Sequence, residues 1–174
     1  MALLTLCLLT GCGSPYKILK PQQEENFKLS DYPTFGFYDV EAQGDTNTNT
    51  FEKNVGVIKE AISRNLQARG LNEARDPALK INIALTIKEQ VQTRQTDFRT
   101  EGLPRYMGQR RYSWKSEDVV VGKYKEGAML IDLVDALNNK MVWKGGSEGI
   151  LPGKSENLAA QINQAVDKVF SKIP

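Results

Sequence analysis

The chain contains few side chains of the types that perform covalent chemistry. It has 174 residues, with two cysteines and no histidine. Histidine is the commonest general base near neutral pH and the commonest metal ligand, so its absence disfavours most hydrolytic and metal-dependent mechanisms. We therefore expect a protein that is not an enzyme and that holds no cofactor and no metal.

One serine lies in a pattern that nucleophiles use. Residues Gly145–Gly149 fit G-x-S-x-G, in which Ser147 would be the nucleophile. That motif requires a strand, a sharp turn and a helix, together with a histidine that takes the serine proton. The segment instead leaves a predicted strand for a loop, so we interpret it as a glycine-rich strand exit. A hydrolase that uses Ser147 or the carboxylates of Asp132 and Asp135 stays as an alternative.

Both cysteines lie at the start of the chain, where their surroundings suggest a modification. Residues 2–10 (ALLTLCLLT) form an apolar run with the length of a signal-peptide core, and the run ends in Leu9-Thr10-Gly11-Cys12. This ending resembles the lipobox of bacterial lipoproteins, which implies that residues 1–11 are a signal peptide and that Cys12 carries the lipid. No basic residue precedes the run, which departs from the usual pattern. The alternative is a buried apolar strand or helix.

Arginine and aromatic residues are concentrated in one long irregular segment, residues 92–115. It holds six basic and two acidic residues, whereas the whole chain has a net charge of +2. Arginine interleaved with aromatic rings is typical of recognition surfaces. We expect an anionic envelope component or a protein as the partner, and no nucleic acid, because the chain carries an export signal. The candidate residues are Arg94, Arg99, Arg105, Tyr106, Arg110, Arg111, Tyr112 and Trp114; the alternative is a solvated loop.

The rest of the pattern predicts the elements that position these residues. A strand at 32–40, a helix from Phe51 that ends near Gly70, and a strand at 80–91 with strict alternation come first. Short strands at 119–124, 129–134 and 141–144 and a helix at 158–173 follow, with a turn at 125–127. The order β-α-β-β-β-β-α predicts an α+β fold, a two-layer sandwich with a mixed, mostly antiparallel sheet of about five strands and both helices on one face.

This arrangement also predicts the domain organisation. Residues 12–29 are polar and irregular and are expected to be a flexible tether, and residues 30–174 are expected to form a single domain. The first two strands should be parallel and the later strands an antiparallel meander. A small apolar ligand held between the helices and the sheet is a further hypothesis, with Phe37, Ile83 and Ile162 as the expected pocket lining.

The stretch Tyr124–Gly145 (YKEGAMLIDLVDALNNKMVWKG) allows a comparison with a known family. It resembles the C-terminal signature of bacterial lipoproteins that carry the domain of unknown function 4136, and the likeness extends from about Phe35 to the C-terminus. The resemblance implies a lipid-anchored envelope protein and supplies no activity and no functional residues.

Together these features predict a membrane-anchored envelope lipoprotein that acts as a non-catalytic binding or structural module. Its domain would lie in the periplasm, attached to a membrane through Cys12. The residues after Cys12, Gly13 and Ser14, are not acidic, which favours the outer membrane.

Overall fold

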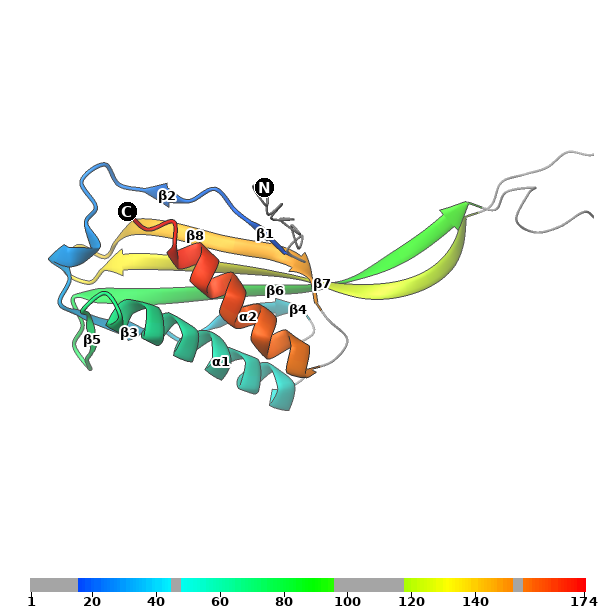
Figure 1. The fold of residues 1–174 in the computed structure, drawn as a ribbon, viewed down its shortest axis with the longest axis horizontal. Coiled ribbons are helices and arrows are strands. Elements are labelled where there is room, and N and C mark those ends of the chain that lie inside the picture. Colours follow the sequence, from blue (N-terminus) through cyan, green and yellow to red (C-terminus); the bar gives the residue numbers. More distant parts are fainter. Residues whose placement is uncertain (1–15, 45–47, 96–117, 152–154) are drawn as a thin grey trace, which may run out of the picture.

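The computed structural model describes residues 16–44, 48–95, 118–151 and 155–174. They form one mixed sheet and two helices, and both helices lie on the same face of the sheet (Figure 1). The predicted α+β class and the placement of the helices are confirmed, whereas the sheet has eight strands rather than about five.

The elements in chain order are β1 (Tyr16–Ile18), β2 (Gln22–Gln23), a short 3-10 helix (Leu29–Asp31), β3 (Thr34–Phe37), β4 (Glu41–Gly44), α1 (Thr48–Gln67), β5 (Asn72–Glu73), β6 (Leu79–Gln95), β7 (Asp118–Asp135), β8 (Lys140–Ile150) and α2 (Ser155–Phe170).

The first predicted crossover is present. β3 and β6 are parallel, with Phe35 beside Leu79, and α1 connects them. The helix stops where Gly70 adopts a φ of +90°, which a glycine tolerates at no steric cost. The N–H of Leu71 then donates to the carbonyl of Leu66 at 3.1 Å, so the end of the helix is closed by backbone hydrogen bonds.

β6 follows the alternation that its sequence predicts. Ile81 and Ile83 are 0% and 1% exposed beneath the helices, whereas Lys80, Asn82 and Ala84 point to the face that the helices leave uncovered. β6, β7 and β8 form the antiparallel meander that the sequence predicts.

The turn that we expected at residues 125–127 is absent, and one strand, β7, replaces the two predicted strands. Gly127 pairs with Ile87 on one side and with Gly149 on the other. A Cβ atom on Gly127 would lie 2.7 Å from a methyl carbon of Leu151. The glycine therefore makes room for a packed leucine, and its resemblance to a turn signal misled the prediction.

The segment expected to be a flexible tether is attached to the domain wherever the structure describes it. Tyr16–Ile18 pairs with β8 in antiparallel register, and Gln22–Gln23 pairs with the same strand farther along. Phe27 and Leu29 are buried in the hydrophobic core. The domain thus begins at least as early as Tyr16 rather than at residue 30.

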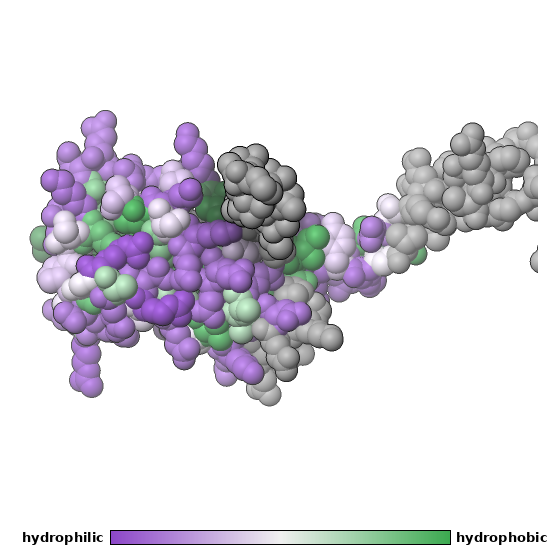
Figure 2. All heavy atoms as spheres, viewed as in Figure 1, coloured by the Kyte–Doolittle hydropathy of each residue, from purple (hydrophilic) through white to green (hydrophobic). Residues whose placement is uncertain are grey.

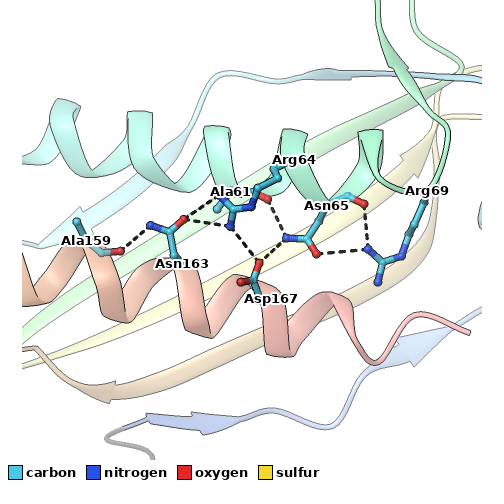
Figure 3. Close-up of polar contacts among 7 residues, drawn as sticks. All are labelled: Ala61, Arg64, Asn65, Arg69, Ala159, Asn163 and Asp167. Carbon is cyan, nitrogen blue, oxygen red and sulfur yellow. Dashed lines mark hydrogen bonds and ion pairs between the residues drawn. The ribbon is translucent and has the colours of Figure 1, made fainter.

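A polar network holds the two helices together on their outer side (Figure 3). Asp167 of α2 accepts hydrogen bonds from Arg64 at 3.1 Å and from Asn65 at 2.7 Å. Arg64 also donates to Asn163. Arg69 donates to the backbone carbonyl of Phe170 at the end of α2 and, within its own helix end, to that of Asn65. These contacts, most of them exposed, fix the relative position of α1 and α2 above the sheet, although each contributes little free energy.

Candidate functional site

Most of the residues that the sequence singles out for binding lie outside the described part of the chain. This holds for Cys12 and for Arg99, Arg105, Tyr106, Arg110, Arg111, Tyr112 and Trp114. Arg94 is in β6, where its backbone pairs with Val119 of β7. The part of the expected irregular segment from Gln92 to Gln95 is therefore a strand.

The strands β6 and β7 continue past the rest of the sheet as a two-stranded ribbon (Figure 1). The flanking strands of the described residues stop beside Ile87 and Glu126, and beyond these positions β6 and β7 pair with each other. The eight residues from Lys88 to Gln95 extend about 25 Å at the usual rise per residue. The ribbon thus extends away from the body of the domain.

The surface of this β6–β7 ribbon carries a cross-strand ion pair and two exposed valines. Lys123 and Glu89 form a cross-strand ion pair at 2.8 Å. Val91 and Val120 are 49% and 58% exposed. Figure 2 shows hydrophilic residues over most of the helix-bearing face and a small hydrophobic area where the ribbon leaves the sheet. A two-stranded ribbon is marginally stable alone, so a long exposed one suggests a contact surface.

Ser147 is held in the middle of a regular strand. It lies within β8, between Ile18 of β1 and Met129 of β7, and it is 6% exposed. The strand continues to Ile150, so the sharp strand-to-helix turn of a nucleophile elbow is absent at this position. The interpretation as a loop is wrong, because the glycines on either side belong to the sheet.

The two candidate carboxylates do not form a pair. Asp132 lies on the uncovered face of the sheet, where the ammonium group of Lys144 on the next strand is 3.4 Å away. Asp135 ends β7 and accepts a hydrogen bond from the backbone N–H of Asn138 at 2.8 Å, as expected for a residue that starts the turn. Each carboxylate thus has a structural role of its own.

Asp135 also contacts a tyrosine whose ionisation it changes. The hydroxyl of Tyr32 donates to Asp135 at 3.1 Å. Burial, together with this hydrogen bond and the nearby negative charge, raises the pKa of Tyr32 to about 12. The hydrogen bond from the backbone of Asn138 and, to a smaller extent, that from Tyr32 lower the pKa of Asp135. The pair joins the segment before β3 to the turn after β7.

A pocket of about 110 Å³ lies between the helices and the sheet, close to the base of the ribbon. Ile162 lines it, as the sequence predicts, whereas Phe37 does not and Ile83 is buried in the core instead. Gly127 and Gly149, which pair across β7 and β8, also line it. Sequence reasoning missed this position because it depends on the register of distant strands. Its apolar walls include Phe51, Ile58, Leu85, Met129, Leu158 and Ile162.

Two other kinds of feature are absent from the described residues. No group of three or more acidic or cysteine side chains is arranged to hold a metal ion there. None of the helices in that part of the chain combines the length and the apolar character needed to cross a membrane.

The fold and these surfaces define a two-layer α+β domain with a protruding ribbon and a helix–sheet pocket. Residues 20–174 match the family described as Domain of unknown function (DUF4136), and the chain belongs to this family. A search of curated proteins gives no match.

Solved structures resemble the fold at low sequence identity. The PelC dodecamer from Paraburkholderia phytofirmans is 12% identical with a TM-score of 0.50, and a variant of the same protein is 11% identical with a TM-score of 0.51; for both, the match covers 90% of this chain and 95% of the other. A PDZ domain protein from Parabacteroides distasonis is 14% identical with a TM-score of 0.49, over 87% of this chain. This chain spans 36% of that protein. At these identities the likeness concerns the fold alone.

Proposed function

We propose that this protein is a lipid-anchored module of the bacterial cell envelope that binds a partner and catalyses no reaction. Cys12 would carry the lipid, and the outer membrane is the favoured location, with the domain in the periplasm. The Leu9–Cys12 box supports the anchor. The absence of histidine from the sequence and the structural roles of Ser147 and Asp135 support a function without catalysis.

The β6–β7 ribbon is the observation that carries this proposal. It projects from the sheet and connects to the segment that holds most of the basic and aromatic candidates (Figure 1). Arginine can form paired hydrogen bonds with phosphate or carboxylate groups while neighbouring rings stack on the same ligand. An anionic envelope component or an acidic protein surface fits this composition.

Crosslinking in intact cells tests the proposal. The variant with Arg105→Glu, Arg110→Glu and Arg111→Glu should lose its crosslinks. If these arginines serve binding rather than folding, the variant should keep the melting temperature of the wild type. The matched control reverses three exposed charges on the body of the domain, Lys20→Glu, Arg75→Glu and Lys172→Glu, and should keep the crosslinks. If both variants crosslink as the wild type does, the arginine-rich segment to which the ribbon connects is a solvated loop that binds no partner.

The identity of the crosslinked molecule separates two classes of partner. PelC, which shares the fold, is described as a dodecamer, so a second copy of this chain is one protein partner to look for. A crosslink between two differently tagged copies would identify self-association. A crosslink to another protein or to an anionic glycan would identify the envelope partner.

A further inference from the structure

The helix–sheet pocket has the chemistry of a ligand site that is separate from the β6–β7 ribbon. We propose that it binds the end of an aliphatic chain that bears one neutral hydrogen-bonding group, such as a hydroxyl. The proposal goes beyond a partner-binding module, since it concerns a small molecule and a different surface. It rests on the size of the pocket, on two buried polar atoms of residues that line it and on the charges of its lining.

The size and the walls of the pocket select an apolar group. Its volume of about 110 Å³ is similar to that of an engineered apolar cavity of about 150 Å³ that binds benzene. It can therefore hold about six carbon atoms at most, so a longer chain would enter by one end. Leu158 and Ile162 of α2, Ile58 of α1 and Met129 of β7 supply aliphatic walls on several sides.

Two buried polar atoms of residues that line the pocket have no hydrogen-bond partner among the described residues. They are the hydroxyl of Tyr16 and the side-chain oxygen of Gln161, and Tyr16 is 9% exposed. The amide nitrogen of Gln161 donates to the carbonyl of Ile150 at 3.3 Å, which fixes the oxygen as the free end of the amide. Buried polar atoms without partners are rare in proteins and costly, so each requires an explanation.

Both atoms are covered in the free protein, so a hydroxyl on the ligand would reach them only after the side chains of Tyr16 and Gln161 turn toward the pocket. It can donate to the oxygen of Gln161 and can accept from the hydroxyl of Tyr16, since an alcohol has both capacities. Gln161 lies between Leu158 and Ile162 in α2, so the polar group would sit beside the apolar wall. One amphipathic ligand thus accounts for the polar and the apolar parts of the lining together.

The charges of the lining favour a neutral group over an anion. None of the described residues that line the pocket is a lysine or an arginine, and Glu148, which is exposed, is the acidic one among them. The ammonium groups of Lys168, 5.2 Å from the centre of the Tyr16 ring, and of Lys17, paired with Glu148, belong to residues outside this lining. A carboxylate would therefore lose its hydration without a cation in the pocket wall. An alcohol should therefore bind more tightly than the carboxylate of equal chain length.

Such a chain could come from two sources. One is a free envelope lipid or alcohol. The other is a fatty acyl chain of the lipid on Cys12, which rests on the anchor proposed above; its ester carbonyl could accept from Tyr16 but has no proton to donate to Gln161. Cys12 precedes Tyr16 by four residues, a stretch of chain that spans at most about 14 Å. The anchor is therefore attached close enough to deliver a chain to the pocket that Tyr16 lines.

Titration with 1-octanol tests the site in the full chain carrying Cys12→Ser, which receives no lipid. The methyl NMR signals of Ile58, Met129, Leu158 and Ile162 should shift in a saturable way and show nuclear Overhauser contacts to the octyl chain. Octanoate should bind at least tenfold more weakly. No saturable shift of these methyl groups up to the solubility limit of 1-octanol would overturn the proposal.

One variant and its matched control tie the binding to this pocket. Ala165→Leu adds three carbon atoms at a residue that is 6% exposed and lines the pocket, and it should abolish binding. Ala160→Leu makes the same change at an exposed position of α2 and should bind as the parent does. Equal binding by Ala165→Leu and Ala160→Leu would place 1-octanol elsewhere and overturn the proposal.

Tyr16→Phe supplies a test that does not depend on how well Ala165→Leu folds. The loss of an unpartnered hydroxyl should leave the melting temperature of the free protein unchanged or raise it, while the affinity for 1-octanol falls several-fold. A lower melting temperature with unchanged affinity would show that the hydroxyl serves the fold, which contradicts the proposal.

The lipidated wild-type chain in lipid nanodiscs distinguishes the sources. If its own acyl chain fills the pocket, its methyl spectrum should match that of the octanol-bound Cys12→Ser chain, and added 1-octanol should cause no further shift. If it matches the free chain and responds to 1-octanol, the ligand is a separate molecule. A spectrum that matches the free chain and does not respond to 1-octanol would contradict the proposal.

Discussion

The indole ring of Trp143 lies over the backbone of Gly145, two residues farther along β8. A Cβ atom at Gly145 would lie 2.2 Å from the Cη2 atom of the ring, closer than two carbon atoms approach without a bond. Trp143 is fully buried, and its ring also packs against Phe170 of α2, with centroids 6.1 Å apart. The Trp-Lys-Gly stretch that ends the family-like signature is thus a packing motif, in which the glycine makes room for the tryptophan.

Gly145→Ala should therefore destabilise the domain by about 3 kcal/mol, because the ring of Trp143 is fixed between the sheet and α2 and cannot move away cheaply. Urea unfolding monitored by tryptophan fluorescence measures this loss. Gly56→Ala is the matched control. A Cβ on Gly56 in α1 meets nothing within 4 Å, so that variant should gain about 0.5–1 kcal/mol from the higher helix propensity of alanine. Equal stability of the two variants would show that Trp143 does not constrain residue 145.

Ile83→Asp should unfold the domain or reduce its stability severely. Ile83 is 1% exposed under the helices, and an unpaired carboxylate there costs several kcal/mol, which is comparable with the whole stability of a small domain. Thr86→Glu, three residues along β6 and on a partly exposed site, should stay within about 0.5 kcal/mol of the wild type. Thermal melts by circular dichroism compare the two, and equal melting temperatures would refute the assignment of faces in β6.

Local sequence patterns predict the parts of the fold that depend on residues close together in the sequence. The alternation around Ile83 and the position of Gly70 depend on neighbouring residues, and both predictions are confirmed. The pairing of Tyr16 with Gly149 and the space that Gly127 leaves for Leu151 depend on residues far along the chain. No periodicity reveals such contacts, and for this reason β1, the continuous β7 and the position of the pocket could not be predicted.

The candidate site could be predicted only in part for a similar reason. Composition alone draws attention to the segment around Arg94, but the ribbon that carries it follows from the unequal lengths of paired strands. Ser147 fits a nucleophile motif in the sequence. In the structure β8 pairs with a strand on each side, so Ser147 lies inside the sheet. The pocket residues have no motif, since Gln161 looks like any polar residue of an amphipathic helix.

Tyr32 should make the free energy of unfolding depend on pH in the alkaline range, and Asp135 should do so in the acid range. The pKa of Tyr32 is raised above its ordinary value of 10.0 to about 12, so its contribution is present below pH 10 and is lost as the pH rises through 12. The pKa of Asp135 is lowered, so its contribution is present above the ordinary carboxyl range and is lost as the pH falls through the lowered value.

Urea unfolding at several pH values compares Tyr32→Phe with the wild type. The free energy of unfolding of the variant should fall less between pH 10 and 12, because phenylalanine has no proton to lose. Tyr38→Phe, which removes a hydroxyl that donates to Asn139, is the matched control and should keep the loss at alkaline pH. A parallel decline in the wild type and Tyr32→Phe would rule out the proposed linkage.

The exposed valines of the β6–β7 ribbon should matter for partner binding and not for folding. Val120→Lys changes a residue that is 58% exposed on the ribbon, and Leu137→Lys changes one that is 92% exposed in the turn at the opposite end of the sheet. Both variants should melt within about 2 °C of the wild type, as expected for surface changes. Crosslinking in cells should fall with Val120→Lys alone; an equal fall with Leu137→Lys would place the contact elsewhere.

The anchor at Cys12 is the claim on which the envelope role depends most, and the intact mass of the membrane-bound protein tests it directly. We expect a chain that begins at Cys12 and carries a diacylglycerol-type modification on that residue. Cys12→Ser should abolish both the modification and the membrane attachment, whereas Cys7→Ser, in the predicted signal peptide, should leave the mature mass unchanged. A membrane-bound wild-type chain with an unmodified Cys12, or one that retains Met1, would contradict the account.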